Sequence, residues 1–576
     1  MSSAAARALV RGACLSVLVV AAALVGTSVA AADKQDVDLL MFGGKVITVD
    51  DRFSIEEAIA IKDGLVVAVG TTDELRKEFR GEQQVNLHGK TVTPGFNDSH
   101  QHIRAVERRS IGDLQNTTSI AAIRDLIAAK VAELGAGEWV TGYGWDETIF
   151  EEGRKPTRQD LDEGAPDSPV LLTRQGGHSS VANSAALEIA GVDRDTPDPE
   201  GGRIERDANG DPTGVLVEDA ADLVSQHVPE LSEEEQREGI IGGLKNMLPY
   251  GITSFTQASG SAGGYADWRE IYDEIGPTLP RASYYLRGDN PDAVLESGLS
   301  PMQGDDQLRV VAAKVFADGG FTGPDAYLSE PYKGMGNFRG NLTHPEAELT
   351  DIFRRLNAAG WPIGVHTAGD AAASVAVNAL AQVLSETPRK DIRHHLMHYE
   401  VGMPKAADIR KMKRYGIGVA QQTNFVFSLE GLYNNYLQDA LLGRVVPAQS
   451  LLDQGIRFSN SSDIIPTSPM LGIYTSVTRK GRTGAVYTPD EALSMKDAIR
   501  AYTTGGAWMT HQEAVKGSLE PGQLADLVVL SDDILRIKKK CLLDVTVNQT
   551  YVGGELVYER EPGDTAGTTP PHRACA

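Results

Sequence analysis

The sequence predicts an α/β protein: a (β/α)8 TIM-like barrel with a small flanking β-sandwich domain that is built from both chain ends. The middle of the chain shows repeated strand-then-helix units, the pattern of a parallel sheet with helical crossovers. Eight strand-like runs can be counted there, and eight fit a closed barrel better than an open sheet. Short β-like segments with turn residues occupy both ends, where they can pair with each other.

The segments at the two ends of the chain have the same sequence pattern. Residues 36–92 alternate short β-like runs with turn pairs such as Asp63-Gly64, which is a strong hairpin signal. Residues 525–558 show the same alternation of β-like runs and turn residues. We therefore expect a β-sandwich made of residues 33–93 and 515–560, with the barrel between them at residues 94–514.

The barrel elements are expected where runs of apolar residues are followed by amphipathic patterns. The expected strands are residues 91–96, 252–257, 281–286, 309–316, 362–366, 393–398, 416–420 and 457–461. The expected helices include residues 345–359, 371–386, 404–415 and 447–454. An insertion at about residues 138–220 follows the first strand, so we expect a lid or pocket wall over the barrel mouth. A surface elaboration without a catalytic role is the alternative.

The N-terminus has the pattern of a secretory signal peptide. Arg7 and Arg11 precede an apolar run at residues 13–25, and Ser-Val-Ala at residues 28–30 is typical of a cleavage site. We expect residues 1–32 to be removed and the protein to be exported, to the periplasm or outside the cell. An uncleaved membrane anchor is the alternative.

Composition limits the partners. The chain has 576 residues, of which 41% are hydrophobic and 23% charged, so it has enough apolar material for a large core. Its formal net charge of −24 opposes binding to a polyanion. We expect a small-molecule substrate, no nucleic-acid partner and no stable membrane span, and leave homo-oligomerisation open.

The three cysteines are too few for a disulfide framework or a cysteine metal site. Cys14 lies in the expected leader, and a bridge between Cys541 and Cys575 stays open if the compartment is oxidising. Cys575 belongs to the polar tail at residues 561–576, which we expect to be disordered.

Two histidines end the first expected barrel strand. The sequence PGFNDSHQH at residues 94–102 contains His100 and His102, separated by one residue. Residues i and i+2 of a strand point to the same side, so both imidazoles can project into the barrel and bind one metal ion.

The same geometric rule applies further along the chain. His366 and His398 stand at the ends of expected strands, and Asp463 follows another. The carboxyl ends of parallel barrel strands face the catalytic mouth. Imidazoles with a carboxylate suit one or two zinc or similar divalent ions. His394 and His395, which precede His398, are expected to face a helix or to support the ligands.

Lys314 lies inside the apolar run VAAKVF at residues 311–316. Burial lowers the pKa of a lysine and makes its neutral amine nucleophilic, so that carbon dioxide can convert it to a carbamate. A carbamylated Lys314 is an anion that can bridge two metal ions. The alternative is an ion pair with a neighbouring carboxylate such as Asp318.

Taken together, these segments resemble the amidohydrolase superfamily, most closely amidohydrolase family 3, the YtcJ-like group that includes N-substituted formamide deformylase. The resemblance runs from about residue 37 to residue 558. Its main motifs lie at residues 94–102, 314–320 (KVFADGG), 365–370 (VHTAGD), 393–398 (RHHLMH) and 462–463 (SD). Supporting motifs are GWD at 144–146, LLTR at 171–174, GH at 177–178, NSAAL at 183–187, GVL at 214–216 and GSLEPG at 517–522.

The resemblance implies a barrel with a flanking β-sandwich and a metal site. The residues that it places in this site are His100, His102, Lys314, His366, His398 and Asp463. It also favours carbamylation of Lys314. The chain departs from the family at Met397, where Glu is usual, and at Gln421-Gln422-Thr423, where a Gln-Pro pair is usual. Both departures can reshape the pocket.

We therefore expect an exported metal-dependent hydrolase that cleaves the C–N bond of a small non-peptide amide with metal-activated water. Asp463 is expected to move the proton, and His178 to stabilise the developing charge and contact substrate. Trp145 is expected to bind substrate. The alternatives are hydrolysis of a cyclic amide or ester at the same site, and a non-catalytic protein that binds a metal or ligand.

Overall fold

The computed structural model describes residues 34–567, except residues 104, 115, 116, 176, 178, 322, 404, 465 and 565. The expected leader at residues 1–32 and the end of the expected tail lie outside the described residues. Within the described part of the chain, no helix combines the length and the apolar character that a membrane crossing needs.

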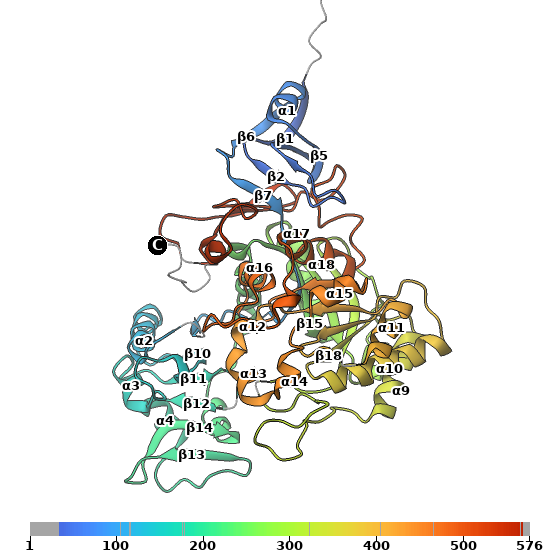
Figure 1. Ribbon diagram of the computed structural model, residues 1–576. Helices are drawn as coiled ribbons and strands as arrows, with labels where there is room; N and C mark the ends of the chain where they lie inside the picture. The colour runs from blue at the N-terminus through green and yellow to red at the C-terminus, as the bar shows by residue number, and fades with distance from the viewer. Residues whose placement is uncertain are drawn as a thin grey trace, which may run out of the picture.

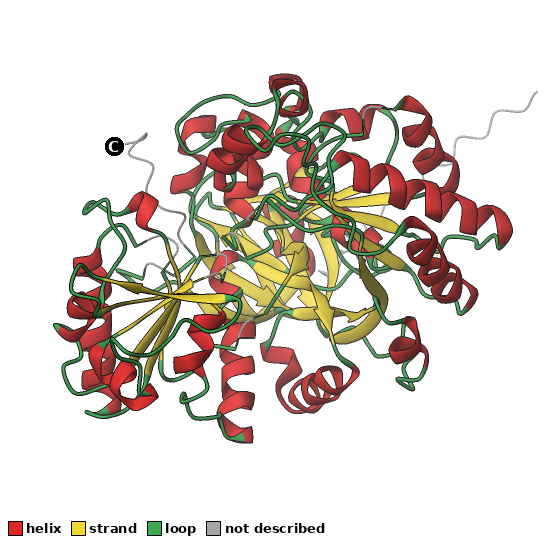
Figure 2. Cartoon of the chain, turned by 90° about the horizontal axis from the view of Figure 1, so that it is seen from below, coloured by secondary structure: helices red, strands yellow, loops and turns green. Residues whose placement is uncertain are grey.

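Eight parallel strands, each paired with its neighbours in chain order, form the central sheet, which is a near-closed barrel. The strands are β8 (Phe96–Gln101), β15 (Ile252–Gly260), β16 (Arg281–Arg287), β17 (Leu308–Phe316), β18 (Ile363–Thr367), β19 (His395–His398), β20 (Gly418–Gln421) and β21 (Phe458–Asn460). Figure 2 shows these strands surrounded by helices. The predicted (β/α)8 architecture is confirmed.

Side chains join the first and last barrel strands. The hydroxyl of Ser459 on β21 donates to Ser99 Oγ on β8 at 2.7 Å, and Ser99 Oγ donates to the carbonyl of Asn460 at 3.1 Å. The Asp98 carboxylate accepts the backbone N–H of Ser462 at 3.0 Å. These contacts bring β8 against the segment that follows β21.

Amphipathic helices cover the barrel where the sequence predicts them. Helix α9 is Glu346–Ala358, α10 is Asp370–Glu386, α11 is Ala406–Tyr415 and α15 is Gln449–Asp453. The α9 side chains Leu349 and Phe353, four residues apart, lie on one face and pack into the core that also contains Val365 of β18. Spacing of apolar residues is therefore enough to place these helices against the sheet.

The first expected barrel strand, residues 91–96, proves to be parts of two strands. Residues Thr91–Pro94 form β7, which pairs antiparallel with β22 (Leu527–Leu530), whereas the barrel strand β8 begins at Phe96. Gly95 lies between them, and a Cβ at Gly95 would lie 2.0 Å from Thr253 Oγ1. The sequence is extended on both sides of Gly95, so its pattern does not show the change of sheet.

Two smaller sheets lie beside the barrel, at the top of Figure 1. One contains β5 (Leu65–Gly70), β4 (Ala58–Lys62), β1 (Gln35–Phe42) and β6 (Phe79–Asn86). The other contains β24 (Glu555–Glu559), β23 (Val547–Val552), β22, β7, β2 (Lys45–Ile47) and β3 (Ile55–Glu56), so it combines both chain ends. Met41, Ile59, Val92 and Leu527 share one hydrophobic cluster across the sheets. Their assignment to one β-sandwich domain stays a prediction.

The segment between β8 and β15 forms a further six-stranded sheet, seen at the lower left of Figure 1. Its strands, in spatial order, are β13 (Gly202–Arg206), β14 (Pro212–Glu218), β12 (Ser179–Ala182), β11 (Val170–Arg174), β10 (Val140–Trp145) and β9 (Ser110–Asp113). Helix α2 (Ile120–Leu134) packs its Ile123 and Ile127 into a hydrophobic cluster of this sheet. The insertion thus has its own core and its sheet begins at Ser110.

A buried ion pair fixes the bottom of the barrel to the six-stranded sheet that combines both chain ends. Arg281, the first residue of β16, donates to the Asp526 carboxylate from Nε at 2.7 Å and from Nη2 at 3.1 Å. The two side chains are only 5% and 7% exposed. The Asp526 carboxylate also accepts the backbone N–H of Gly553 at 2.8 Å.

Replacing Asp526 with Ala should lower the free energy of unfolding by about 3–5 kcal/mol, because the Arg281 charge stays buried without its carboxylate. Chemical denaturation measures this change. The double variant Arg281→Met, Asp526→Leu should lose less than the single variant. Asp36→Ala, which removes the exposed Asp36–Arg80 pair, is the control and should change little. An unchanged denaturation midpoint for Asp526→Ala would contradict the role of this pair.

Candidate metal centre

Two imidazoles meet at the mouth end of β8. His100 belongs to β8 and is fully buried, and His102 follows two residues later. Their Nε2 atoms lie 3.2 Å apart. The i, i+2 spacing therefore turns both rings to the same side, as the sequence predicts.

Asp463 reaches the same place from the other edge of the sheet. Its backbone N–H donates to the carbonyl of His100 at 3.0 Å. Its Oδ2 lies 3.9 Å from His100 Nε2 and 3.9 Å from His398 Nδ1. Asp463 and His398 both have positive φ angles, 56° and 68°, which non-glycine residues adopt only at a cost in free energy. The surrounding contacts hold the two residues in this conformation.

The most compact set of ligand atoms comes from three residues. One ligand atom each of His100, His398 and Asp463 lie within 4.8 Å of one another, and all three residues are buried. The three residues are far apart in the chain and come from β8, β19 and the segment after β21. Only the closed barrel brings them together.

His366 of β18 completes a row of imidazoles. Its ring centroid lies 4.3 Å from that of His398, whose centroid lies 4.5 Å from that of His100. The ring of Phe316 stacks on His366 with centroids 4.9 Å apart. Phe316 therefore forms one wall of the centre.

Lys314 points into the same space from β17. Its Nζ lies 3.4 Å from His100 Nε2 and 3.5 Å from His102 Nε2. Burial lowers the pKa of Lys314 to about 8, although the charge of Asp463 opposes the change. A lowered pKa makes the neutral, nucleophilic amine accessible near neutral pH.

The alternative partner for Lys314, Asp318, is engaged elsewhere. Its carboxylate accepts three backbone N–H groups, from Tyr327 at 2.9 Å, Ala368 at 3.0 Å and Gly369 at 2.8 Å. Burial raises the pKa of Asp318 to about 8. Asp318 therefore organises the loops after β17 and β18, and no described contact joins it to Lys314.

The donor set fits a divalent metal ion. His100 Nδ1, His366 Nδ1 and His398 Nε2 are buried and have no hydrogen-bond partner. His366 Nε2 faces the carbonyl of Gly319 at 3.4 Å, which places the proton on Nε2 and the lone pair on Nδ1. Burial lowers the pKa of His366 to about 3 and those of His100 and His398 well below the ordinary value. Zinc prefers neutral imidazoles beside a carboxylate, and in this set His366 and His398 each have a buried nitrogen with no hydrogen-bond partner.

Two other predicted site residues lie elsewhere or outside the description. His178 lies outside the described residues. Trp145 has no exposed surface, packs in a hydrophobic cluster of the insertion, and donates from Nε1 to the carbonyl of Leu172 at 3.0 Å. The substrate-binding role predicted for Trp145 therefore loses its support, because its ring and its N–H are both used in the insertion core.

His394 faces a helix, which was one of the expected placements. Its Nδ1 accepts the backbone N–H of Ile363 at 3.0 Å, and its Nε2 lies 3.2 Å from Asn357 Oδ1 on α9. His395 Nδ1 lies 3.1 Å from the carbonyl of Arg393.

Two residues at the centre escaped the sequence analysis. Asp98 is fully buried, burial raises its pKa to about 7, and its carboxylate holds Ser462 beside Asp463. The alternation Asp98, His100, His102 along one strand face was a signal for it. Gln422 lies 2.9 Å from His398 Nδ1 through its Oε1. The sequence analysis named Gln422 only as part of Gln421-Gln422-Thr423 and did not predict its contact with His398.

A cavity of about 710 Å³ adjoins the mouth end of β15 and β16. Leu286, Arg287 and Asp289 line it, and Arg287 pairs in register with Lys314 on the next strand. Arg287 also lies over the ring of Phe316, 5.1 Å from its centroid. Phe316 therefore lies between this cavity and the imidazoles of the centre.

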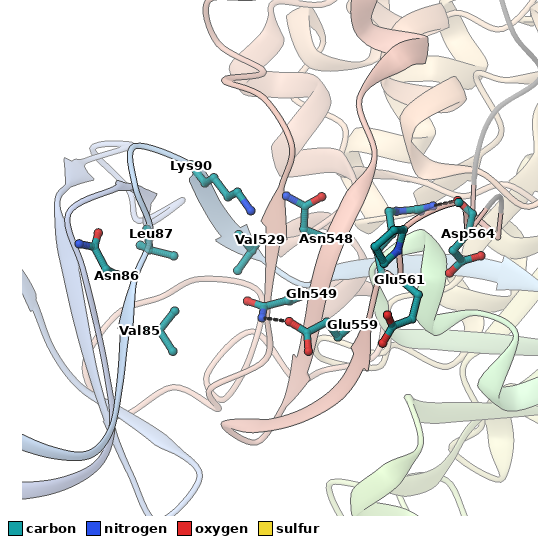
Figure 3. Close-up of a pocket in the computed structure, with 13 residues that line it drawn as sticks. Val85, Asn86, Leu87, Lys90, Val529, Asn548, Gln549, Glu559, Glu561 and Asp564 are labelled. Carbon is teal, nitrogen blue, oxygen red and sulfur yellow. Dashed lines mark hydrogen bonds between the residues drawn. The ribbon is translucent and has the colours of Figure 1, made fainter.

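A second cavity, of about 440 Å³, lies far from the centre (Figure 3). Its walls are β6, the C-terminal strands and residues 559–564. The lining side chains include Lys90, Asn548, Gln549 and Glu559, and Gln549 donates to Glu559 at 2.8 Å. None of the residues that line it belongs to the metal centre.

Comparison with known proteins agrees with this geometry. A sequence model of the amidohydrolase family matches residues 83–558. The chain is 30% identical to YtcJ of Bacillus subtilis (strain 168) over 540 residues, covering 90% of this chain and 99% of the relative. It is 29% identical to the N-substituted formamide deformylase of Arthrobacter pascens, covering 91% and 98%. A crystal structure of a metal-dependent hydrolase from Pyrococcus horikoshii superposes with a TM-score of 0.68 at 25% identity, covering 87% and 99%. This chain therefore belongs to the amidohydrolase family, an enzyme family of metal-dependent hydrolases.

Proposed function

We propose that this enzyme hydrolyses the C–N bond of a non-peptide amide in a small molecule, with one or two divalent metal ions, zinc first among them, at the centre. The observation that carries the proposal is the convergence of the buried imidazoles of His100 and His398 on the Asp463 carboxylate. The formamide deformylase among its relatives acts on a C–N bond and supports this substrate class. A non-catalytic protein, the other alternative, does not agree with membership of an enzyme family.

The residues that would hold the metal are His100, His102, Lys314, His366, His398 and Asp463. A bound divalent ion supplies Lewis acidity, which polarises a carbonyl and makes water ionise near neutral pH. The surrounding chain excludes bulk water, because the imidazoles of His100 and His398 are buried. The low dielectric constant of such a site strengthens every charge interaction in it.

Asp463 is the residue placed to move the proton. Its side chain is 11% exposed, whereas that of His100 is 0% exposed, so the carboxylate is more accessible to water than this imidazole. In the proposed reaction the water oxygen forms a bond to the carbonyl carbon and Asp463 accepts the water proton. Asp463 then delivers this proton to the nitrogen as the C–N bond breaks. The backbone N–H of Asp463 donates to the carbonyl of His100, and this hydrogen bond fixes the main chain from which the carboxylate extends.

Replacing Asp463 with Asn should lower kcat by about 10²–10⁴-fold, because the amide cannot accept the proton. Metal analysis of the same preparation should find the metal largely retained, since the histidine ligands are unchanged. The matched control is Asp305→Asn. Asp305 precedes β17, at the end of this strand away from Lys314, so the variant should keep full activity. Wild-type turnover by Asp463→Asn would remove the proton-transfer role.

The same assay separates the candidate substrates. N-formyl amines, cyclic amides and simple esters are offered to the metal-loaded enzyme at equal concentration. Preference for the N-formyl amines supports the proposed class, whereas preference for cyclic amides or esters replaces it with the alternative reaction at the same site.

We also propose that Lys314 is carbamylated in the active enzyme. An ammonium 3.4 Å from His100 Nε2 would repel a cation held by the same imidazole. In the modification, the lone pair of the neutral amine forms an N–C bond to carbon dioxide and one proton leaves. The charge at this position then changes from positive to negative, which suits a metal site.

Intact-mass analysis of gently purified, metal-loaded enzyme should show the added mass of one carbon dioxide, and labelled bicarbonate should place the label on Lys314. The modification should be lost when the metal is removed. Lys314→Arg cannot form the carbamate and is the control. An unmodified amine in metal-loaded, active enzyme would rule out this proposal.

We propose finally that the enzyme is exported. The leader pattern at residues 1–32 is one support, and the disulfide-bonded state of Cys541 fits an oxidising compartment. The mature protein should be recovered outside the cytoplasm without its leader, and a non-reduced peptide map should show a Cys541–Cys575 link. Intact N-terminal Met1 on cytoplasmic enzyme would contradict export.

A further inference from the structure

A directed chain of hydrogen bonds ends on His398. The hydroxyl of Ser461 donates to the backbone carbonyl of Gln421 at 2.9 Å. The Gln422 side-chain Nε2 donates to Ser461 Oγ at 2.8 Å. Gln422 Oε1 then faces His398 Nδ1 at 2.9 Å. Gln422 and Ser461 are buried, so water does not compete for these bonds.

The direction of the chain is fixed at its far end. A backbone carbonyl can only accept, so the Ser461 hydroxyl must use its proton on Gln421. Ser461 Oγ is then an acceptor, and it must receive an N–H from the Gln422 amide. This places the amide oxygen toward His398 and requires a proton on His398 Nδ1. The tautomer of His398 is therefore set by a main-chain carbonyl three hydrogen bonds away.

The tautomer decides what His398 offers to the centre. With the proton on Nδ1, Nε2 carries a lone pair, and this Nε2 is buried without a hydrogen-bond partner. Gln422 Oε1 at 2.9 Å is closer to Nδ1 than Asp463 Oδ2 at 3.9 Å, so the N–H is directed to the amide. The ring of Phe425 lies parallel to the imidazole, with centroids 6.1 Å apart and planes at 12°, and supports the same orientation.

We propose that Gln422 is a positioning residue that fixes His398 as an Nε2 metal ligand. The proposal rests on the proposed function, because it assumes that the centre holds a metal ion. Gln422 has no other role in the proposed mechanism.

The test compares metal binding by the metal-stripped full-length enzyme, titrated with Zn²⁺ against a chromophoric chelator. Gln422→Leu should weaken Zn²⁺ affinity by about 10- to 100-fold, the usual effect of losing a partner of a metal-bound histidine. Gln422→Glu should restore most of the affinity, because its carboxylate accepts the same N–H. Ser461→Ala removes the group that orients the amide and should have an intermediate effect. His398→Ala gives the reference for complete loss of this ligand.

Thr423→Val is the matched control, since Thr423 is buried next to Gln422 and its hydroxyl donates to the carbonyl of Gly472 at 2.8 Å. Its affinity should equal that of wild type. Thermal melting of the apoproteins checks that the Gln422 variants fold. Histidine nitrogen NMR of the apoprotein adds a spectroscopic signature: the Nδ1–H tautomer of His398 should persist in Gln422→Glu and be lost in Gln422→Leu.

The outcomes separate two failures. Wild-type affinity in Gln422→Leu, or equal weakening in Gln422→Glu and Gln422→Leu, would overturn the positioning role while leaving the metal site intact. Failure of the wild-type enzyme to bind Zn²⁺ or another divalent ion would instead remove the proposed function. A Gln422→Leu variant that does not fold leaves Gln422→Glu, Ser461→Ala and the NMR signal to decide.

Discussion

The seam between the first and last barrel strands is the constraint on which the rest of this structure depends. Asp98 on β8 accepts the backbone N–H of Ser462, and His100 accepts that of Asp463 through its carbonyl. These bonds join residues more than 360 positions apart in the chain. They hold the segment after β21 against β8 and place the Asp463 side chain beside the histidines. The same contacts that bring the two edges of the sheet together therefore also assemble the centre.

Burial gives the centre its chemistry. Removing the imidazoles from water makes their charged forms costly, so they stay neutral and keep lone pairs. The same burial keeps bulk water from competing for those lone pairs. Lys314 follows the same rule, since a buried amine in this cluster loses its proton more readily than one in water. A bound metal ion would satisfy lone pairs that are otherwise unsatisfied in a low dielectric medium, and the proposed carbamate would supply a negative charge beside it.

The insertion and the two smaller sheets differ in how they contact the barrel and in what their interiors contain. The insertion forms a sheet with its own hydrophobic clusters, so its interior, Trp145 included, is occupied by packing. The six-stranded sheet that combines both chain ends is tied to the barrel bottom by Arg281 and Asp526. That sheet therefore stabilises the end opposite the mouth. The cavity at the ends of β15 and β16 includes Arg287, which lies over the ring of Phe316 at the mouth.

Local patterns were enough to predict several features of this chain. The i, i+2 spacing of His100 and His102 and the strand-end positions of His366 and His398 follow from the repeat of a strand and the direction of a parallel sheet. The helices around the barrel follow from apolar spacing. The prediction for residues 91–96 was wrong in one respect, because the change of sheet at Gly95 leaves no trace in hydrophobicity.

The sequence by itself determined which side chains can bind a metal ion and on which strands they lie, because those properties depend on residue type and local period. Tertiary structure alone decided which partners these side chains have. Asp318 binds three backbone N–H groups in place of Lys314, Trp145 turns into the insertion core, and Gln422 fixes the proton on His398. Such hydrogen bonds join residues distant in the chain or depend on backbone direction, so no local sequence pattern encodes them.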